Sequence, residues 1–436
     1  MEMLDIEVFE GGFKETELGP LPEEWEVVRL GEVAEISSGG SAPQGKEYFG
    51  GKNPFIRVQH LDNDNYTIKG CDYITDEAVR KYKLKLFPKG TIIFPKSGAS
   101  IYSEKRAKLP FDAYIVSHLM AVISRSPLLL QDYLFFNLIS KKLSKNKADN
   151  YPTLNISEVS QIPIPLPPLE EQKAIAGILS TVQSAFEKTE KVINALKNLK
   201  KSMMKHLFTY GPVAEEEAEK VELKETEIGL IPKHWEVVRL GEVYNITKKP
   251  KGLRIENYDA VPFVPMEGIG FGAFSVNFII KDPEEISSGN YFEKGDLLLA
   301  KITPSFENGK QAIADNIPID FGIATTEVIP IKQAEKGLIS YLFYYLQKPD
   351  VRQSLASKME GTTGRQRLPK EVLLNTLIPL PPLEEQQKIA QILQSIDQRI
   401  EKEEKYKNAL QNLFKSLLHN LMTGKIRVRV KSHGKD

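Results

Sequence analysis

Two long stretches of the chain carry apolar residues at the spacing of a helix that packs lengthwise against a partner. The apolar positions recur roughly every 3.5 residues from Ile175 to Leu207, and again from Ile389 to Leu421, a period typical of a coiled-coil seam. The sequence therefore predicts two helices of roughly 42 residues, each about 60 Å long at about 1.5 Å per residue. The expected seam residues are Ile175, Val182, Leu196, Met203, Ile389, Ile396, Leu410 and Leu417.

Both predicted helices begin with the same seven residues. "LPPLEEQ" occupies 166–172 and 380–386, a shift of 214 positions (166 to 380). The prolines suit a helix start, where a missing N–H costs nothing, and the paired glutamates favour the positive end of the helix dipole. Gly211 and Gly424 are natural helix stops.

A second repeated segment precedes each variable block. "KETELGPLPEEWEVVRLGEV" (14–33) recurs as "KETEIGLIPKHWEVVRLGEV" (224–243), and the two tryptophans of the chain, Trp25 and Trp235, occupy matching positions in it. Between these segments and the helices the two halves have little similarity. The chain is therefore an internal repeat, in which a variable block is followed each time by a nearly constant helix.

The helices have two possible partners. Each could lie along its own variable block, or the two copies could pair with each other. A helix of about 42 residues is longer than a block of about 140 residues, so part of its apolar stripe needs another partner. Because a block separates the helices in the chain, an antiparallel coiled coil is the simpler closure. We expect the blocks at opposite ends of that coiled coil, related by a pseudo-twofold axis.

The variable blocks predict an α+β fold with several short strands. Apolar runs such as "GTIIFPK" and "VPFVPM" are separated by Gly, Pro, Asn and Asp turns, and one helix is expected in each block, near 129–147 and 338–358. The chain then divides into a first β-rich domain, a repeated helix, a second β-rich domain with an acidic linker at its start, and a second repeated helix with a basic tail. The boundaries are 1–165, 166–212, 213–376 and 377–436.

Charge distinguishes the two blocks although the whole chain is balanced at 58 Lys and Arg against 58 Asp and Glu. Residues 30–165 hold 18 basic and 13 acidic side chains, a net of +5, whereas residues 240–376 hold 16 and 17, a net of −1. The acid is concentrated in residues 1–29 and 213–227, which we expect to be solvated linkers.

Turn-rich loops in both blocks combine basic, polar and aromatic side chains. Arg, Lys, Gln and Asn pair with base edges, and Ser, Thr and Lys hold phosphates. One such loop could be ordinary solvated surface, but their occurrence in two matched blocks favours DNA. The expected contacts of the first block are Ser41, Gln44, Lys46, Arg57, Gln59, His60, Lys96, Ser97, Tyr102, Lys105, Arg106, Asn150 and Tyr151. Those of the second are Lys248, Lys249, Lys251, Arg254, Lys301, Thr303, Asn308, Lys310, Arg365, Gln366 and Arg367.

The sequence lacks the motifs of common catalytic sites. It has no Walker loop and no Asn-Pro-Pro-Tyr or Asp-Pro-Pro-Tyr methyltransferase signature, and its six histidines show no metal-ligand spacing. The single cysteine excludes a disulfide framework, and neither a signal peptide nor an 18-residue apolar run is present. We expect a soluble cytoplasmic protein without a metal or a catalytic centre.

The repeated "PLPPLEEQ" helix start, following two dissimilar domains, resembles the specificity (S) subunit of type I restriction–modification systems. The entry "G-x-[LI]-P-x-x-W-x-V-V-x-L-G-E-V" at 19–33 and 229–243 is similar to the entrance of that family's target-recognition domains, and "GTTGRQRLPKEVLLN" (361–375) is similar to the domain exit. The resemblance covers about residues 14–424. The corresponding segment of the first half, "KADNYPTLNISEVSQ", matches the family's domain exit less closely.

The resemblance implies a non-enzymatic reader of double-stranded DNA that recognises an asymmetric bipartite site. It also implies that the chain docks methyltransferase and restriction subunits along helices 168–209 and 381–423, and that S-adenosylmethionine, ATP and magnesium belong to those subunits. Two alternatives stay open: a coiled-coil interaction scaffold that does not contact bases, and a self-sufficient nuclease or methyltransferase.

Overall fold

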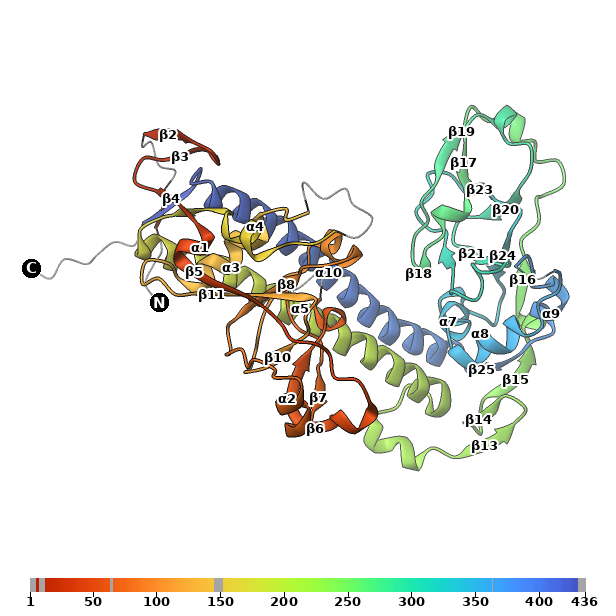
Figure 1. Ribbon diagram of the computed structural model, residues 1–436. Helices are drawn as coiled ribbons and strands as arrows, with labels where there is room; N and C mark the ends of the chain where they lie inside the picture. Colours follow the sequence, from red (N-terminus) through yellow and green to blue (C-terminus); the bar gives the residue numbers. More distant parts are fainter. Residues whose placement is uncertain (1–4, 8–11, 63–65, 145–151, 363, 430–436) are drawn as a thin grey trace, which may run out of the picture. The chain divides into compact units, whose positions relative to one another are not determined.

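The computed structural model describes residues 1–436 except 1–4, 8–11, 63–65, 145–151, 363 and 430–436 (Figure 1). The chain divides into two compact units. Unit 1 comprises residues 1–192 and 403–436, and unit 2 comprises residues 193–402. Each long helix contributes to both units, so the pairing of the helices is observed separately in each.

The two predicted helices are present and antiparallel. They are α5 (Leu169–Tyr210) and α10 (Leu383–Met422), of 42 and 40 residues. In unit 1 the Lys407 ammonium lies 3.0 Å from a Glu190 carboxylate oxygen, and in unit 2 Lys200 lies 2.8 Å from Asp397. The paired positions add up to 597 in both cases (190 and 407; 200 and 397). A constant sum is the register of antiparallel helices, which confirms that expectation.

Each helix also packs on a variable block, so both anticipated partners are used. In unit 1 one core contains Ile175 and Leu179 from the start of α5 together with Leu418 and Leu421 from the end of α10. In unit 2 the core contains Leu207 from the end of α5 with residues from the start of α10. Each block is therefore built against the start of one helix and the end of the other.

All eight predicted seam residues are buried or half-buried, but the apolar pattern in the sequence is broader than the buried face of the helices. Four further residues of the same 3.5-residue pattern are exposed, because an α-helix turns every 3.6 residues and drifts away from a strict heptad. Phe186 and Ile193, which belong to the same pattern, are buried, and so is Phe414, which adjoins the exposed Leu413. The exposed residues are Val192, Leu199, Tyr406 and Leu413.

The repeated "LPPLEEQ" segment fastens each helix start to its block. The Gln172 side chain is fully buried, accepts a hydrogen bond from the Leu130 backbone N–H at 2.9 Å and donates to the Leu128 carbonyl. Gln386 repeats this with the Leu338 N–H at 2.9 Å and the Lys336 carbonyl. Buried polar groups require such partners, so these residues are fixed by hydrogen bonding.

The glutamate before each glutamine accepts the indole N–H of the repeated tryptophan. Trp25 Nε1 donates to Glu171 Oε2 at 3.0 Å, and Trp235 Nε1 donates to Glu385 Oε2 at 2.8 Å. The other Glu171 contact is Arg427, which follows α10 and whose Nε lies 2.5 Å from Oε1. Although burial opposes its charge, the carboxylates of Glu171 and Glu24 raise the pKa of Arg427. These contacts close unit 1 between residues 256 positions apart.

The main sheet of unit 1 is buried on both faces. In β8, Ile92 and Phe94 belong to one core and Ile93 to another, and Met120 and Ala121 of β11 divide in the same way. This explains the continuous apolar runs in the sequence. The four-stranded sheet has the order β5 (Ala34–Ser38), β11 (Leu119–Ser124), β8 (Ile92–Pro95), β9 (Ala107–Lys108), and the three-stranded sheet β10 (Tyr114–Ile115), β6 (Phe49–Ile56), β7 (Asp72–Ile74). The remaining elements are β1 (Asp5–Glu7) paired with β26 (Arg427–Arg429), β2 (Phe13–Thr16) with β3 (Gly19–Pro22), β4 (Glu26–Arg29) with β12 (Pro163–Leu166), and helices α1 (Leu30–Val33), α2 (Asp76–Lys81), α3 (Gln131–Ser140) and α4 (Ile156–Ser160).

Unit 2 repeats this plan with a five-stranded and a four-stranded sheet. The orders are β16 (Tyr244–Ile246), β24 (Val328–Gln333), β21 (Leu297–Ala300), β22 (Gln311–Ile313), β18 (Phe271–Ala273), and β19 (Ile279–Lys281), β17 (Val261–Val264), β23 (Phe321–Ala324), β20 (Asn290–Glu293). The remaining elements are β13 (Leu223–Thr226) paired with β14 (Gly229–Pro232), β15 (Glu236–Arg239) with β25 (Leu377–Leu380), and helices α6 (Leu240–Val243), α7 (Ile339–Tyr345), α8 (Pro349–Ala356) and α9 (Lys370–Leu374).

Several expectations about local structure need correction. The stretch 1–29 is not a solvated linker, because its described residues form strands such as β2, β3 and β4 and bury Leu21 and Trp25 in the core of unit 1. The single helix expected near 338–358 is two helices, because Pro349 lacks an N–H and begins α8 after α7 has ended at Tyr345. The acidic stretch 213–227 is largely exposed, as expected, but its residues 215–220 form a 3-10 helix and residues 223–226 form strand β13.

We predict that Arg427→Met lowers the free energy of unfolding by about 3–5 kcal/mol, because it leaves the Glu171 carboxylate buried without its cation. Urea denaturation of the full chain measures this. The matched control is Lys388→Met, which removes the exposed Lys388–Glu384 pair at 2.8 Å and should change stability by less than about 1 kcal/mol. Equal effects of the two substitutions would contradict the assignment.

A second prediction concerns Asp296, which is 3% exposed and accepts a hydrogen bond from the Glu293 N–H at 2.7 Å. Burial raises the pKa of Asp296 to about 6. A raised pKa means that folding favours the protonated carboxyl. The resulting stability is fully present below the unfolded-state pKa of about 4 and is lost as the pH rises through 6. Asp296→Asn should therefore gain roughly 1–3 kcal/mol relative to the wild type between pH 4 and pH 8. The exposed Asp315→Asn should show no such gain, and a pH-independent difference for Asp296→Asn would refute the prediction.

Candidate nucleic-acid interface

Three segments that are distant in the sequence meet at the end of strand β8 in unit 1. The Lys96 N–H donates to the His118 carbonyl at 2.9 Å, and the Lys96 carbonyl accepts from the Leu154 N–H at 2.7 Å. The Gly98 N–H donates to the Pro152 carbonyl at 2.8 Å. We call residues 96–98, 118 and 152–154 the first junction.

Unit 2 has the same arrangement at the end of strand β21. The Lys301 N–H donates to the Glu327 carbonyl at 3.0 Å, and the Lys301 carbonyl accepts from the Leu368 N–H at 2.8 Å. The Thr303 N–H donates to the Gln366 carbonyl at 3.0 Å. Residues 301–303, 327 and 366–368 form the second junction, so loops that were predicted separately from the sequence lie side by side in both units.

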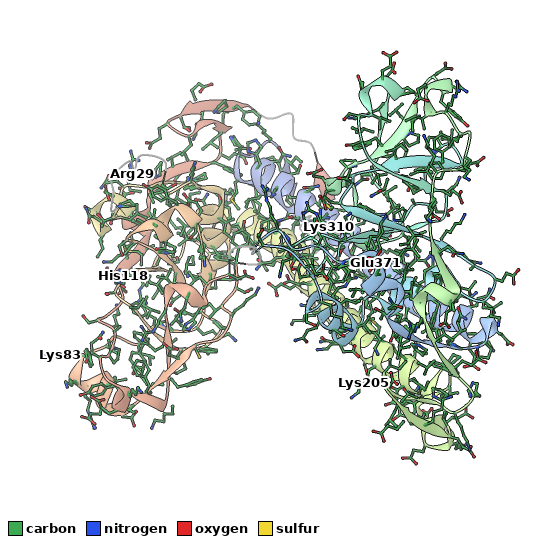
Figure 2. All side chains as sticks on the ribbon, turned by 90° about the vertical axis from the view of Figure 1, so that its right-hand side faces the viewer. Arg29, Lys83, His118, Lys205, Lys310 and Glu371 are labelled. Carbon is green, nitrogen blue, oxygen red and sulfur yellow. The ribbon has the colours of Figure 1, made fainter. Side chains whose placement is uncertain are left out.

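The side chains of the first junction are polar and partly exposed. Ser97 Oγ lies 2.6 Å from His118 Nδ1, which leaves the other ring nitrogen of this exposed histidine (labelled in Figure 2) available to a ligand. Lys96 Nζ donates to Ser38 Oγ at 2.7 Å and so brings the 37–52 stretch to the junction. The junction therefore presents hydroxyl, imidazole and ammonium groups, which suit phosphate and base edges.

The second junction carries a stronger charge cluster. Arg367 Nε and Nη2 donate to the two carboxylate oxygens of Glu327 at 2.8 and 2.7 Å. The hydrogen bond from Arg367 lowers the pKa of Glu327 and raises that of Arg367. Burial, with Lys370 and Arg367 nearby, lowers the pKa of Lys301. The Glu327 carboxylate therefore lies near two cations, Arg367 and Lys301.

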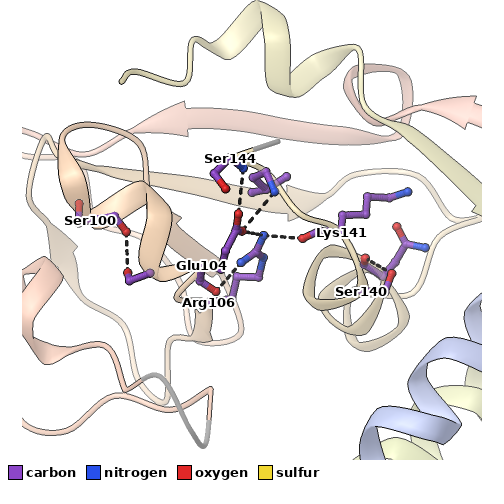
Figure 3. Close-up of polar contacts among 9 residues, drawn as sticks. Ser100, Glu104, Arg106, Ser140, Lys141 and Ser144 are labelled. Atoms are coloured by element: carbon purple, nitrogen blue, oxygen red, sulfur yellow. Dashed lines mark hydrogen bonds and ion pairs between the residues drawn. The ribbon is translucent and has the colours of Figure 1, made fainter. Parts of the chain in front are cut away.

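Arg106 was wrongly predicted as a DNA contact. Its side chain is 2% exposed, and its guanidinium donates to the Glu104 carboxylate at 2.6 Å and to the Lys141 carbonyl at 2.7 Å (Figure 3). Glu104 also accepts the Ser144 N–H at 2.9 Å, which draws down its pKa although burial opposes this. This ion pair fixes the 95–106 loop against residues 141–144 and leaves no group for DNA.

His60 was also wrongly predicted, because it is buried and its Nδ1 accepts the Arg57 N–H at 3.0 Å. Burial lowers the His60 pKa and so favours the neutral ring. Arg57 itself is half-buried and lies 2.5 Å from Asp72, with its guanidinium over the Phe49 and Phe55 rings. Arg57 is therefore held by the three-stranded sheet.

The other predicted contacts fall into four groups. Thr303, Gln366, Lys301 and Arg367 lie at the second junction, and Lys96 and Ser97 at the first. Lys310 (labelled in Figure 2) donates to the Met266 carbonyl at 2.9 Å, and Thr303 Oγ1 donates to Glu307 at 2.8 Å. Asn150 and Tyr151 lie outside the described residues. The exposed or half-buried remainder are Ser41, Gln44, Lys46, Gln59, Tyr102, Lys105, Lys248, Lys249, Lys251, Arg254, Asn308 and Arg365.

Sequence reasoning missed His118, Ser38, Glu327 and Lys370. His118 interrupts the apolar run "YIVSHLMAVIS", and that interruption was the available signal. Within the described ranges, no three or more His, Cys, Asp and Glu side chains cluster in a way that could hold a metal ion. None of the described helices is long and apolar enough to cross a membrane.

Comparison with known proteins assigns this two-unit architecture to a protein family. A family model described as "Type I restriction modification DNA specificity domain" matches the chain twice, over residues 22–198 and 232–412. The type I restriction enzyme MjaVIII specificity subunit of Methanocaldococcus jannaschii is 32% identical over 433 residues, covering 96% of this chain and 97% of the relative. The putative MjaX specificity subunit of the same organism is 30% identical over 448 residues, covering 96% and 98%.

Solved structures show the same fold. The type I restriction–modification S subunit from M. genitalium superposes with a TM-score of 0.60 at 16% identity, over 91% of this chain and 96% of that one. A chain from a structure of complex assembly and conformational transition in the type I R-M system gives a TM-score of 0.50 at 21% identity, over 93% and 99%. With two family matches and relatives similar over nearly its whole length, this chain belongs to the type I restriction–modification DNA specificity family.

Proposed function

We propose that this chain is the DNA sequence-specificity subunit of a type I restriction–modification complex. Each unit's block recognises one half of an asymmetric, bipartite site in double-stranded DNA. The observation that carries this proposal is the pair of junctions, which share three backbone hydrogen bonds but present different side chains. A common frame with different side chains suits two readers of different base sequences.

The polar side chains of the junctions support direct contact with DNA. The first junction offers Lys96, Ser97 and His118, and the second offers Lys301 and Arg367. Lysines and hydroxyl groups suit phosphates, whereas arginine suits the edges of guanine. The exposed lysines at 248, 249 and 251 add positive charge to a block that is nearly neutral overall.

The long helices supply a surface for partner subunits. Val192 and Leu199 on α5 are 41% and 46% exposed, and Tyr406 and Leu413 on α10 are 52% and 47% exposed. The two pairs are equivalent in the repeat, since each is shifted by 214 positions (192 to 406; 199 to 413). On our proposal the methyltransferase subunits dock here, restriction subunits join the complex, and S-adenosylmethionine, ATP and magnesium belong to those partners, while this chain is not catalytic.

Because the second block is nearly neutral, one alternative function is considered: an interaction scaffold that does not contact bases. Charge reversal at Lys248, Lys249, Arg365 and Arg367 separates the two functions. A scaffold would keep full activity, whereas a DNA reader would lose it, because four negative charges at the interface repel the phosphate backbone and weaken binding to any sequence.

A domain exchange tests the proposed function directly. Residues 31–163 are replaced by the corresponding block of a family member with another specificity, and modified bases are mapped in cells that also express the methyltransferase partner. We expect the half-site read by unit 1 to change while the other half-site and the gap remain. A change in both halves would contradict the assignment of one reader to each half-site.

We further predict that Leu413→Asp weakens binding of the methyltransferase subunit at least tenfold, about 1.4 kcal/mol, because an apolar contact at an interface becomes a desolvated charge. Titration of the purified chain with that subunit gives the affinity. The control is Asn412→Asp, at an exposed neighbouring position, which adds the same charge beside Leu413 and should have little effect on this affinity. Unchanged affinity for Leu413→Asp would exclude this face.

A further inference from the structure

The guanidinium of Arg367 is held by one of its two edges. Glu327 accepts both hydrogen bonds along the Nε–Nη2 edge, at 2.8 and 2.7 Å. The guanidinium is planar and carries five N–H groups, so the Nη1–Nη2 edge keeps a parallel pair of donors. The Arg367 side chain is 48% exposed, whereas that of Glu327 is 24% exposed. The free edge is therefore available to a ligand, while the carboxylate behind it is more covered.

The backbone of Arg367 is fixed as firmly as its side chain. Its N–H and carbonyl exchange hydrogen bonds with Glu360 at 2.8 and 2.9 Å, and it lies opposite Ile302 in a β-bridge. Gly361 turns the chain at a φ of 128°, where a side chain would come within 2.8 Å of the Arg365 carbonyl. A contact group held in this way loses little conformational entropy on binding.

The surroundings also favour an anionic partner with acceptor groups. Lys301 lies near the Arg367–Glu327 pair, so the paired Glu327 carboxylate has two cations beside it. A lone carboxylate at a phosphate-binding surface would repel DNA. A carboxylate that is already paired with arginine does not, and it fixes the direction of the guanidinium instead.

The matched position in the first junction has different chemistry. Glu327 and His118 both accept the N–H of the junction lysine through their carbonyls, at 3.0 and 2.9 Å. The partner of Glu327 is Arg367 from the exit segment, whereas the partner of His118 is Ser97 from the β8 end. The side-chain pair at this position therefore differs between two otherwise equal frames, as a specificity determinant should.

We propose that Arg367 reads a guanine in the half-site of the second unit through its free Nη1–Nη2 edge, with Glu327 as the positioning residue that orients it. This inference rests on the proposed function and adds to it the base, the reading side chain and its support. Guanine fits because its O6 and N7 are two adjacent acceptors, which match a forked pair of donors in the major groove.

The test uses the chain in complex with its methyltransferase partner and a library of DNA duplexes. The first half-site is kept constant, the second is randomised, and the enrichment of each base is measured after selection. We expect Arg367→Ala to lose about 10- to 100-fold selectivity for one guanine and to keep the other positions. Arg367→Lys should lose the same selectivity although it keeps the charge, because an ammonium cannot form the fork.

Glu327→Gln tests the positioning role. It should lower selectivity at the same guanine by a smaller factor, and the double variant with Arg367→Ala should be no worse than Arg367→Ala alone, because both residues act through one contact. The control is Arg365→Ala, two positions away and exposed, which should weaken binding to all sequences alike. Thermal unfolding and retained selection of the first half-site verify that each variant is folded.

Three results would overturn the inference. Retained guanine selectivity in Arg367→Lys would show that only the charge matters, as in a phosphate contact. A loss of selectivity spread evenly over the half-site in Arg367→Ala would show that Arg367 does not read one guanine. A change of selectivity at another base in Glu327→Gln would show that Glu327 does not position Arg367 for that guanine. If the wild-type complex still selects a bipartite site, the proposed function stands although this inference fails. If the wild-type complex selects no sequence, the proposed function itself is contradicted.

Discussion

The antiparallel register of α5 and α10 is the constraint on which the rest of the structure depends. Because the paired positions add up to the same number in both units, the start of each helix always lies beside the end of the other. Each block therefore finds the same composite surface, made of one helix start and one helix end, on which to build its core. Two blocks with little sequence similarity can share this support because the contacts come from the nearly constant helices.

The attachment of the blocks is polar as well as apolar. Gln172 and Gln386 tie each helix start to the loop before a buried helix, and Glu171 and Glu385 accept the indole N–H of Trp25 and Trp235. Buried polar contacts of this kind are costly when unmatched, so they favour one geometry over close alternatives. This accounts for the repetition of "LPPLEEQ" and of the tryptophan segment, since both members of every contact must be present in each half. The junction loops take no part in these contacts and are free to differ.

The frame was predictable from the sequence, whereas the junctions were not. The helix bounds and the antiparallel pairing followed from a period, two repeated segments and the available partners. The exposed faces of Leu199 and Leu413 did not follow, because a heptad count ignores the drift of a 3.6-residue helix. The junctions join segments that are distant in sequence through backbone hydrogen bonds, which leave no residue pattern, so His118 and Glu327 were missed. Arg106 and His60 looked like DNA contacts because composition does not show burial, although Glu104, two residues before Arg106, was a visible partner.

Thiol crosslinking within single chains tests the register most directly. In a Cys71→Ser background, a short crosslinker should join Glu190→Cys to Lys407→Cys, and Lys200→Cys to Asp397→Cys, since each pair is in contact. Lys200→Cys with Lys415→Cys should not react, because position 415 lies about 27 Å along the helix from the partner of 200 in this register. The account predicts two crosslinked pairs and one unreactive pair. Efficient crosslinking of 200 to 415 with failure of the other two would indicate parallel helices and contradict it.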